Sequence, residues 1–176
     1  SSFLSSSVAV SPTIISRGDE IIPLFTAASP IISPPTMETA LPTAEGALAI
    51  VLAETQITVC GMRVGVLGFG RVARAVAYLF RAVGADVTVF VRREEARVSA
   101  ELAGYRAMLL TSLAETVCEM DTVINTVPHR IVTGEIISRM EKDTLIVDLA
   151  SMPGGVDFDL AKELGIHAIH ALALPG

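Results

Sequence analysis

The stretch "VGVLGFGRVA" at residues 64–73 decides the fold. Its apolar run ends at Gly68, which is typical of a strand buried on both faces of a sheet. Gly68, Gly70 and Ala73 fit the pattern G-x-G-x-x-A, and apolar residues at helical spacing continue as far as Gly84. Such a turn either binds a pyrophosphate or serves only as a strand-to-helix corner. The pattern of the remaining sequence distinguishes the two.

The residues after this turn alternate between strand-like and helix-like segments. Further strands are predicted over residues 86–91, 105–110, 121–128, 144–151 and 167–172, with helices over 93–104, 133–140 and 156–165. Ser112 is expected to cap another helix, because Glu115 follows three residues later, at the capping-box spacing. Parallel neighbouring strands need crossovers of about a dozen residues, and these segments supply them. We therefore predict an α/β fold with a doubly wound parallel sheet, the Rossmann architecture that binds NAD(P).

The first part of the chain follows a different pattern. Its strand-like pieces are separated by Ser, Pro and Gly, with no room for crossover helices. We predict part of a smaller N-terminal α/β domain over residues 1–42, a linking helix within 43–60 and the nucleotide-binding domain over 61–176. Thr43 is expected to cap the linking helix, with Glu45 in its first turn.

Composition excludes several classes of protein. Although 51% of the residues are hydrophobic, no stretch approaches the roughly 18 apolar residues that a membrane span requires. The net charge of −6 argues against a general nucleic-acid binder. High apolar content in a chain of 176 residues predicts that another subunit covers some of the surface, and hence a homo-oligomer.

The cysteines and histidines suggest no metal site. Cys60 and Cys118 have no paired spacing, so we expect buried free thiols in a reducing compartment. The N-terminus has no basic leader before an apolar core, and the cytoplasm is the expected location. His129 is expected to face the cleft, whereas His167 and His170 are expected to be structural, and none has metal-ligand spacing.

The glycine turn and the end of the second strand predict the cofactor. Gly68 permits the tight turn, Phe69 follows it, and Gly70 lets the backbone approach a pyrophosphate. The amides of Arg71 and Val72 would point at the phosphate from the start of the helix. An NAD enzyme places an acidic residue about 20 residues further on, to bind the ribose 2′-hydroxyl.

The sequence has Arg92 and Arg93 at that place instead. A guanidinium matches a 2′-phosphate in charge and geometry, so NADP is predicted over NAD. Arg92, nearer the strand, is the first choice as phosphate ligand. The alternative is that both arginines are solvated residues at the start of a helix.

Polar residues follow two later strands at the carboxyl edge of the sheet, where ligands bind in such folds. Asn125, Thr126, Val127 and Pro128 are predicted to contact the ribose or nicotinamide side of the cofactor, the alternative being an ordinary turn. The segment "DLASMPGG" at 148–155 brings Asp148, Ser151, Gly154 and Gly155 to the same edge. Its amides either hold a carboxylate or form a structural turn.

Four segments together resemble a known family. "PTAEGA" (42–47), "GFGRVA" (68–73), "INTVP" (124–128) and "DLASMPGGVDF" (148–158) are similar, in order and spacing, to the A subunits of bacterial dipicolinate synthase. The resemblance covers about residues 42–176. Chains of this family are longer, and a small residue is more usual at the place of His129.

The resemblance implies an NADP-dependent oxidation during sporulation. The cyclic product of 4-hydroxy-tetrahydrodipicolinate synthase would lose water and a hydride to become pyridine-2,6-dicarboxylate, alongside a flavoprotein-type B subunit. Thr43 and Ser151, with Gly154 and Gly155, are the candidates for holding the carboxylates of this small dicarboxylate, and Glu45 is the candidate proton acceptor. Two alternatives stay open: another NADP-dependent dehydrogenase of similar fold, such as a shikimate or 2-hydroxyacid dehydrogenase, and an NADP-binding module without chemistry.

Overall fold

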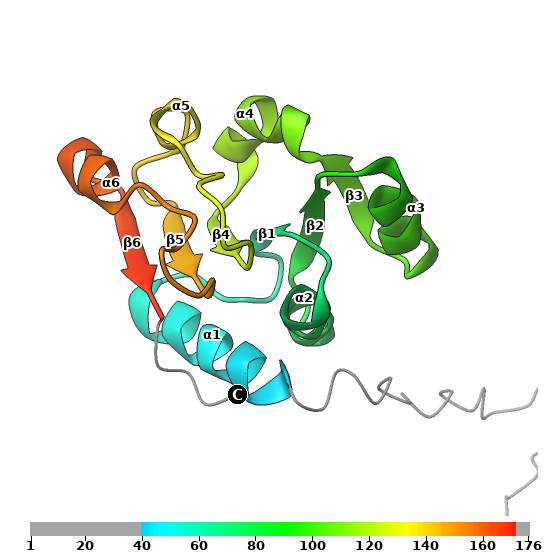
Figure 1. The fold of residues 1–176 in the computed structure, drawn as a ribbon. Helices are drawn as coiled ribbons and strands as arrows, with labels where there is room; N and C mark the ends of the chain where they lie inside the picture. Colours follow the sequence, from blue (N-terminus) through cyan, green and yellow to red (C-terminus); the bar gives the residue numbers. More distant parts are fainter. Residues whose placement is uncertain (1–39, 172–176) are drawn as a thin grey trace, which may run out of the picture. The chain divides into compact units, whose positions relative to one another are not determined.

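The computed structural model describes residues 40–171, which contain a parallel sheet of six strands in the order β3-β2-β1-β4-β5-β6 (Figure 1). The strands are β1 (Arg63–Leu67), β2 (Asp86–Val91), β3 (Arg106–Leu109), β4 (Thr122–Asn125), β5 (Leu145–Asp148) and β6 (His167–His170). The helices are α1 (Leu41–Glu54), α2 (Arg71–Ala82), α3 (Glu94–Leu102), α4 (Leu113–Thr116), α5 (Gly134–Ile137) and α6 (Phe158–Leu164). The predicted doubly wound α/β fold is confirmed. Strand order reverses between β1 and β4, which is where such sheets bind nucleotides.

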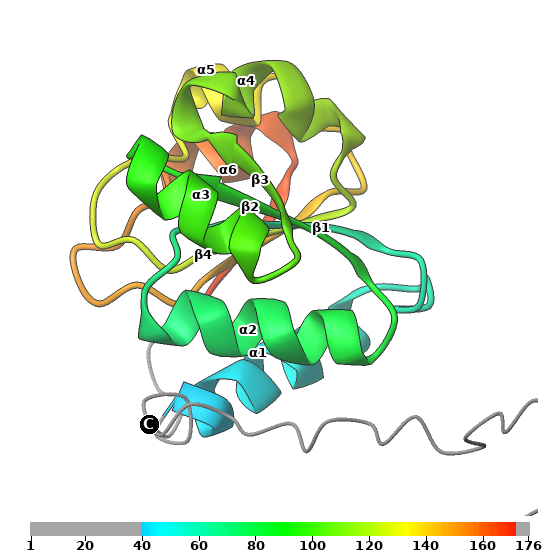
Figure 2. The same ribbon diagram turned by 90° about the vertical axis from the view of Figure 1, so that its right-hand side faces the viewer.

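Side chains at alternate strand positions point to opposite faces of the sheet and belong to two separate hydrophobic cores. Val64, Val66 and Val89 pack with α1, α2 and α3 on one face. Leu67 and Phe90 pack with α4, α5 and α6 on the other. Figures 1 and 2 show the two helical layers, with α1 and α2 side by side under the sheet. Burial on both faces explains why the strands read as continuous apolar runs.

The helix α1 starts earlier than predicted. It begins at Leu41 after Ala40, and no side chain caps it. Pro42 lies in the first turn, where its fixed φ favours helix initiation. Thr43 is therefore the third helical residue and not the cap, and Glu45 is exposed beyond the first turn. The predictions of a Thr43 cap and of a first-turn Glu45 are wrong.

Two other local predictions fail because of neighbouring structure. Ser112 has helical backbone angles and its hydroxyl makes no capping bond, since a 3₁₀ turn already leads into α4. Cys60 and Cys118 are exposed rather than buried. Their apolar neighbours Val59 and Val117 take the inward positions instead.

The predicted N-terminal domain over residues 1–42 lies almost entirely outside the described residues. A helix, α1, occupies most of the range in which the linking helix is predicted; it ends at Glu54 and packs against α2 and β5. Within residues 40–171, no helix combines the length and the apolar character needed to cross a membrane.

Candidate cofactor-binding cleft

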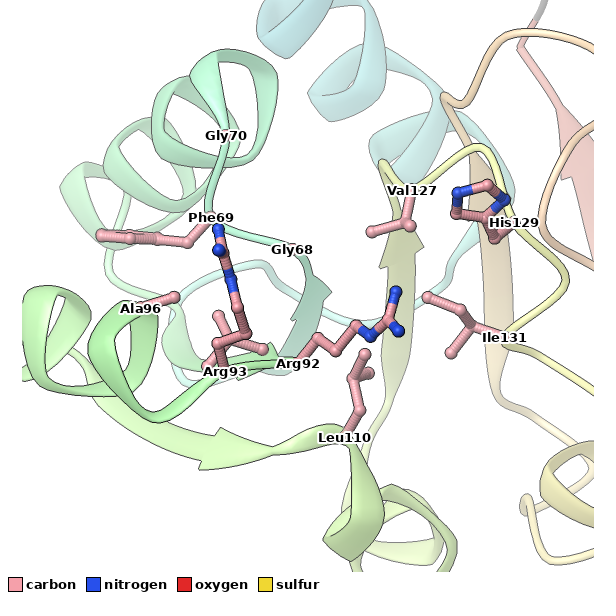
Figure 3. Close-up of a pocket in the computed structure, with 11 residues that line it drawn as sticks. Gly68, Phe69, Gly70, Arg92, Arg93, Ala96, Leu110, Val127, His129 and Ile131 are labelled. Carbon is pink, nitrogen blue, oxygen red and sulfur yellow. The ribbon is translucent and has the colours of Figure 1, made fainter.

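An open cleft with a volume of about 510 Å³ lies at the carboxyl ends of β1, β2 and β4 (Figure 3). The glycine turn forms one side, and the loop after β4 forms the opposite side. The lining residues are Gly68, Phe69, Gly70, Val91, Arg92, Arg93, Ala96, Leu110, Val127, His129 and Ile131. Apolar walls with two arginines suit a ligand that joins a flat ring to phosphates.

The glycine turn has the geometry that its sequence predicts. Gly68 adopts a φ of +102°, and its amide donates to the Phe90 carbonyl at the end of the neighbouring strand. Gly70 precedes the first residue of α2, and a Cβ at Gly70 would have no heavy atom within 4 Å. The first-turn amides, including those of Arg71 and Val72, have no capping side chain. This end of α2 is open to an anion.

Phe69 is fixed on the outer side of the turn. Its backbone lines the cleft, while its ring points away from it toward Tyr105, with ring centroids 6.0 Å apart (Figure 3). The Arg74 guanidinium lies 4.2 Å from the Phe69 ring centroid, and its Nε donates to the Phe69 carbonyl at 3.1 Å. These contacts hold the turn in place without occupying the cleft.

Arg92 and Arg93 leave the end of β2 in different directions. Figure 3 shows the Arg93 side chain extending toward the Gly68–Phe69 turn and that of Arg92 extending toward Val127 and Ile131. Within residues 40–171, neither arginine belongs to an ion pair. The nearby carboxylate of Glu94 is held by Arg97, which lowers the pKa of Glu94 through a hydrogen bond. Both cleft arginines are thus available to an anionic ligand.

The loop after β4 contributes fewer cleft contacts than predicted. Of the four residues from Asn125 to Pro128, only Val127 lines the cleft. Asn125 is fully buried, where it donates to Asp148 Oδ1 at 2.8 Å and to the Val127 carbonyl at 3.0 Å. The Thr126 hydroxyl donates to the Leu67 carbonyl, and Pro128 is exposed. Asn125 and Thr126 therefore shape the loop with side chains already engaged in the protein.

His129 and His170 occupy the positions that the sequence indicates. His129 lines the cleft, as expected. His170 stacks on Phe158 with ring centroids 5.3 Å apart and hydrogen-bonds the Ala150 carbonyl, so it is structural. His167 is exposed, and its Nε2 lies 3.7 Å from a Glu54 carboxylate oxygen. Within the described part of the chain, no group of three metal-ligating side chains occurs.

In the loop after β5, the amides of Gly154 and Gly155 are already hydrogen-bonded within the protein. The Gly154 amide donates to the Ser151 carbonyl at 3.0 Å, and the Gly155 amide donates to Asp148 Oδ2 at 2.8 Å. They are not free for a carboxylate, so the structural-turn alternative is correct for these two glycines. Ser151 itself is exposed. Among the described residues, those that line the cleft do not include Thr43, Glu45 or Ser151.

Sequence reasoning missed the apolar part of the cleft wall. Ala96 lies on α3, Leu110 follows β3, and Ile131 follows β4. They come from three different crossovers, so no local pattern connects them. The one available signal is that each follows the carboxyl end of a strand that neighbours β1 directly or through β2.

These features define the nucleotide-binding domain of a dehydrogenase. A family model described as D-isomer specific 2-hydroxyacid dehydrogenase, NAD binding domain, matches residues 49–174, and the chain belongs to this family. It carries the nicotinamide-cofactor domain of an oxidoreductase.

Particular relatives confirm the resemblance seen in the sequence. The chain is 42% identical over 141 residues to the A subunit of dipicolinate synthase from Bacillus subtilis, covering 77% of this chain and 46% of that protein. The crystal structure of the dipicolinate synthase A subunit from Bacillus halodurans superposes with a TM-score of 0.77 at 36% identity, over 80% of this chain and 48% of that one. A shikimate dehydrogenase (NADP(+)) of Methanosarcina mazei is 40% identical over 83 residues, covering 43% of this chain and 30% of that protein. The chain thus spans less than half the length of these relatives.

Proposed function

We propose that the protein is an NADP-dependent oxidoreductase that acts as the A subunit of a dipicolinate synthase. The observation that carries the choice of NADP is the pair Arg92 and Arg93 at the end of β2, where an NAD enzyme has a carboxylate. A carboxylate there would accept a hydrogen bond from the ribose hydroxyl and repel a 2′-phosphate. Two guanidinium groups without ion pairs in the described chain favour the phosphate.

The cleft supports a specific orientation of the cofactor. The open start of α2 at Gly70 suits the pyrophosphate. The apolar surface of Leu110 and Ile131 suits the adenine ring. Arg93 extends toward the glycine turn and is therefore as good a candidate for the 2′-phosphate as Arg92, the sequence-based first choice.

The substrate is proposed from the relatives. The A subunit of dipicolinate synthase is similar to this chain in both sequence and structure, and this supports oxidation of the 4-hydroxy-tetrahydrodipicolinate/dihydrodipicolinate ring to pyridine-2,6-dicarboxylate. When bound, the nicotinamide supplies the hydride acceptor. Because the product is aromatic, the protein's main task is to orient the ring carbon and to hold two carboxylates.

Thr43, Glu45 and Ser151 remain the proposed residues on the substrate side. The amino-terminal end of α1, the start of α2 and the loop after β5 all lie toward the same edge of the sheet (Figure 2). Ser151 and Glu45 are exposed, and Thr43 is half-buried. A hydroxyl at Thr43 or Ser151 would donate to a substrate carboxylate, and the Glu45 carboxylate would accept a proton.

A second candidate function is another NADP-dependent dehydrogenase. The similarity to shikimate dehydrogenase (NADP(+)) favours it, although that match covers only 43% of this chain. A cofactor-binding module without chemistry is the third, and an activity assay separates it from both enzymes.

The same proposal includes partners and location. We propose a flavoprotein-type B subunit as a working partner, a homo-oligomer and a cytoplasmic location during sporulation. Exposed apolar side chains at Leu52 and Ile57 support contact with another subunit. Light scattering at several concentrations tests the homo-oligomer, and a mass equal to one chain excludes it.

The test of the reaction is a coupled assay. Freshly generated 4-hydroxy-tetrahydrodipicolinate is incubated with the protein and NADP⁺, with and without the B subunit, while NADPH and dipicolinate are both measured. The proposal predicts the two products in equal amounts. Turnover of shikimate but not of this substrate would instead support the second candidate, and binding without turnover of either would support the third.

A further inference from the structure

The buried carboxylate of Asp148 is the centre of a network that joins two loops. Asp148 ends β5 and is fully buried. It accepts three hydrogen bonds, from Asn125 Nδ2 at 2.8 Å, from the Ala150 amide at 3.0 Å and from the Gly155 amide at 2.8 Å. A buried charge with three good donors is both satisfied and sensitive to the loss of any one of them.

Gly155 carries this network to the loop after β4. Its carbonyl accepts from the amides of Ile131 and Val132 at 3.0 and 2.9 Å. A Cβ at Gly155 would lie 2.3 Å from Asn125 Nδ2 and 2.8 Å from the His129 carbonyl, so the two backbones touch where no side chain fits. Gly155 therefore holds the loop after β4 in two ways: its carbonyl binds two amides of the loop, and its backbone packs directly against the His129 carbonyl.

Asn125, the last residue of β4, connects Asp148 to the start of the same loop. Its amide oxygen accepts from the Val127 amide at 3.1 Å, and its amide nitrogen donates to the Val127 carbonyl at 3.0 Å. The bonds from Asn125 and Gly155 hold Val127 and Ile131, two residues of the cleft wall opposite the glycine turn.

We propose that Asp148 is a positioning residue for cofactor binding, which sets the distance between the loop after β4 and the glycine turn through Gly155 and Asn125. Asp148 does not line the cleft itself; it holds Asn125 and Gly155, whose own hydrogen bonds hold Val127 and Ile131 in the cleft wall. This inference rests on the proposed binding of a nicotinamide dinucleotide in the cleft. Displacing binding groups by a fraction of an ångström weakens recognition even when the fold is retained.

The experiment compares Asp148→Asn with Asp121→Asn. Asp121 also accepts several hydrogen bonds, all from Arg63, but it lies at the amino-terminal ends of the strands, away from the cleft. Both variants are expected to unfold at lower temperature than the wild type. Only Asp148→Asn is expected to weaken NADPH binding at a temperature where all three proteins are folded, by on the order of tenfold. Equal affinities for the wild type and Asp148→Asn would overturn the inference.

A second readout tests the inference without any cofactor. Amide hydrogen exchange is followed at Ile131 and Val132, whose bonds to Gly155 depend on the network, and at Val89 in the middle of β2. Asp148→Asn should accelerate exchange at the first two amides by a larger factor than at Val89, whose exchange follows global stability. Asp121→Asn should accelerate exchange at Ile131 and Val132 by no more than at Val89. Unchanged exchange at Ile131 and Val132 in Asp148→Asn would contradict the inference, whatever the cofactor proves to be.

Failure of this inference differs from failure of the proposed function. If the wild type binds neither NADPH nor NADH, the proposed function falls, and exchange alone decides the role of Asp148. If the wild type binds NADPH and Asp148→Asn binds it equally well, only the positioning role falls.

Discussion

Gly68 lies so close to Thr126 that a Cβ at Gly68 would be 2.8 Å from the Thr126 Oγ1. Thr126 cannot easily move away, because its hydroxyl donates to the Leu67 carbonyl at 2.8 Å. The glycine turn is thus packed against the loop after β4 at Gly68 and open at Gly70, two residues further along the chain.

The two glycines should respond differently to alanine. Gly68→Ala combines this clash with a φ of +102°, so we expect a loss of about 1–3 kcal/mol in the free energy of unfolding. Gly70→Ala meets no atom and should cost about 1 kcal/mol or less. If a pyrophosphate lies against Gly70, this variant should nevertheless lose most of its affinity for NADPH.

Urea denaturation and a fluorescence titration measure both quantities on the same preparations. Full NADPH affinity in Gly70→Ala would contradict the placement of the pyrophosphate at the turn. Full stability in Gly68→Ala would contradict the packing described for the turn.

The apolar wall should matter equally for NADPH and NADH. Ile131 is half-buried in the cleft, and replacing it with Asn removes apolar contact with an adenine ring that both cofactors share. We expect affinity for each cofactor to fall by about tenfold, with their ratio unchanged. Ile57→Asn, at an exposed position outside the cleft, is the control and should bind as the wild type does. A change in the NADPH-to-NADH ratio would place Ile131 near the 2′-phosphate instead of the adenine.

The ion pair of Arg63 and Asp121 should contribute to stability in a pH-dependent manner. The hydrogen bond from Arg63, with its charge, lowers the pKa of Asp121 below its ordinary value of 3.8. A depressed carboxyl pKa contributes stability that is present above the unfolded-state pKa and is lost as the pH falls through the lower folded-state value. Because the Arg63 side chain is half exposed, we expect only about 0.5–1 kcal/mol at pH 7.

Chemical denaturation of the wild type and Asp121→Asn checks this dependence. The difference in unfolding free energy should be present at pH 7 and should shrink as the pH is lowered below about 4. A difference that stays constant down to the lowest pH at which both proteins fold would show that charge is not its source.

The exposed cysteines give a direct test of one correction. Cys60 and Cys118 both lie at the surface, so both should react with a chromogenic disulfide reagent in the native protein, without denaturant. Single Cys→Ser variants assign the two reactions. A thiol that reacts only after unfolding would restore the buried state expected from its sequence neighbours.

The sequence was sufficient where local patterns determine structure. The β1 strand, the glycine turn and the start of α2 are contiguous, so apolar run, glycine spacing and helical period all predict the same structure. Arg92 and Arg93 could be assigned to the cleft because their distance along the chain from the turn is fixed by one β-α-β unit.

The sequence was insufficient where contacts between residues far apart in the chain determine the local structure. The position of Asn125 at the end of a strand suggests a cofactor ligand, yet its side-chain amide is hydrogen-bonded to Asp148 on the neighbouring strand. The amides of Gly154 and Gly155 look free until Asp148 and the Ser151 carbonyl are placed beside them. Ala96, Leu110 and Ile131 meet only when the crossovers fold, so the apolar part of the cleft wall has no contiguous motif in the chain.

The selection of NADP by Arg92 and Arg93 is tested most directly by titrating the protein with NADPH and with NADH, and by repeating both titrations for Arg92→Ser, Arg93→Ser and the double variant. Arg139→Ser, which removes one positive charge on the surface after α5, is the control for net charge. We predict that the wild type prefers NADPH, and that the double variant loses on the order of a hundredfold in affinity for NADPH while its affinity for NADH stays nearly constant. Equal affinities of the wild type for the two cofactors, or an undiminished preference for NADPH in the double variant, would contradict the claim that these arginines select a 2′-phosphate.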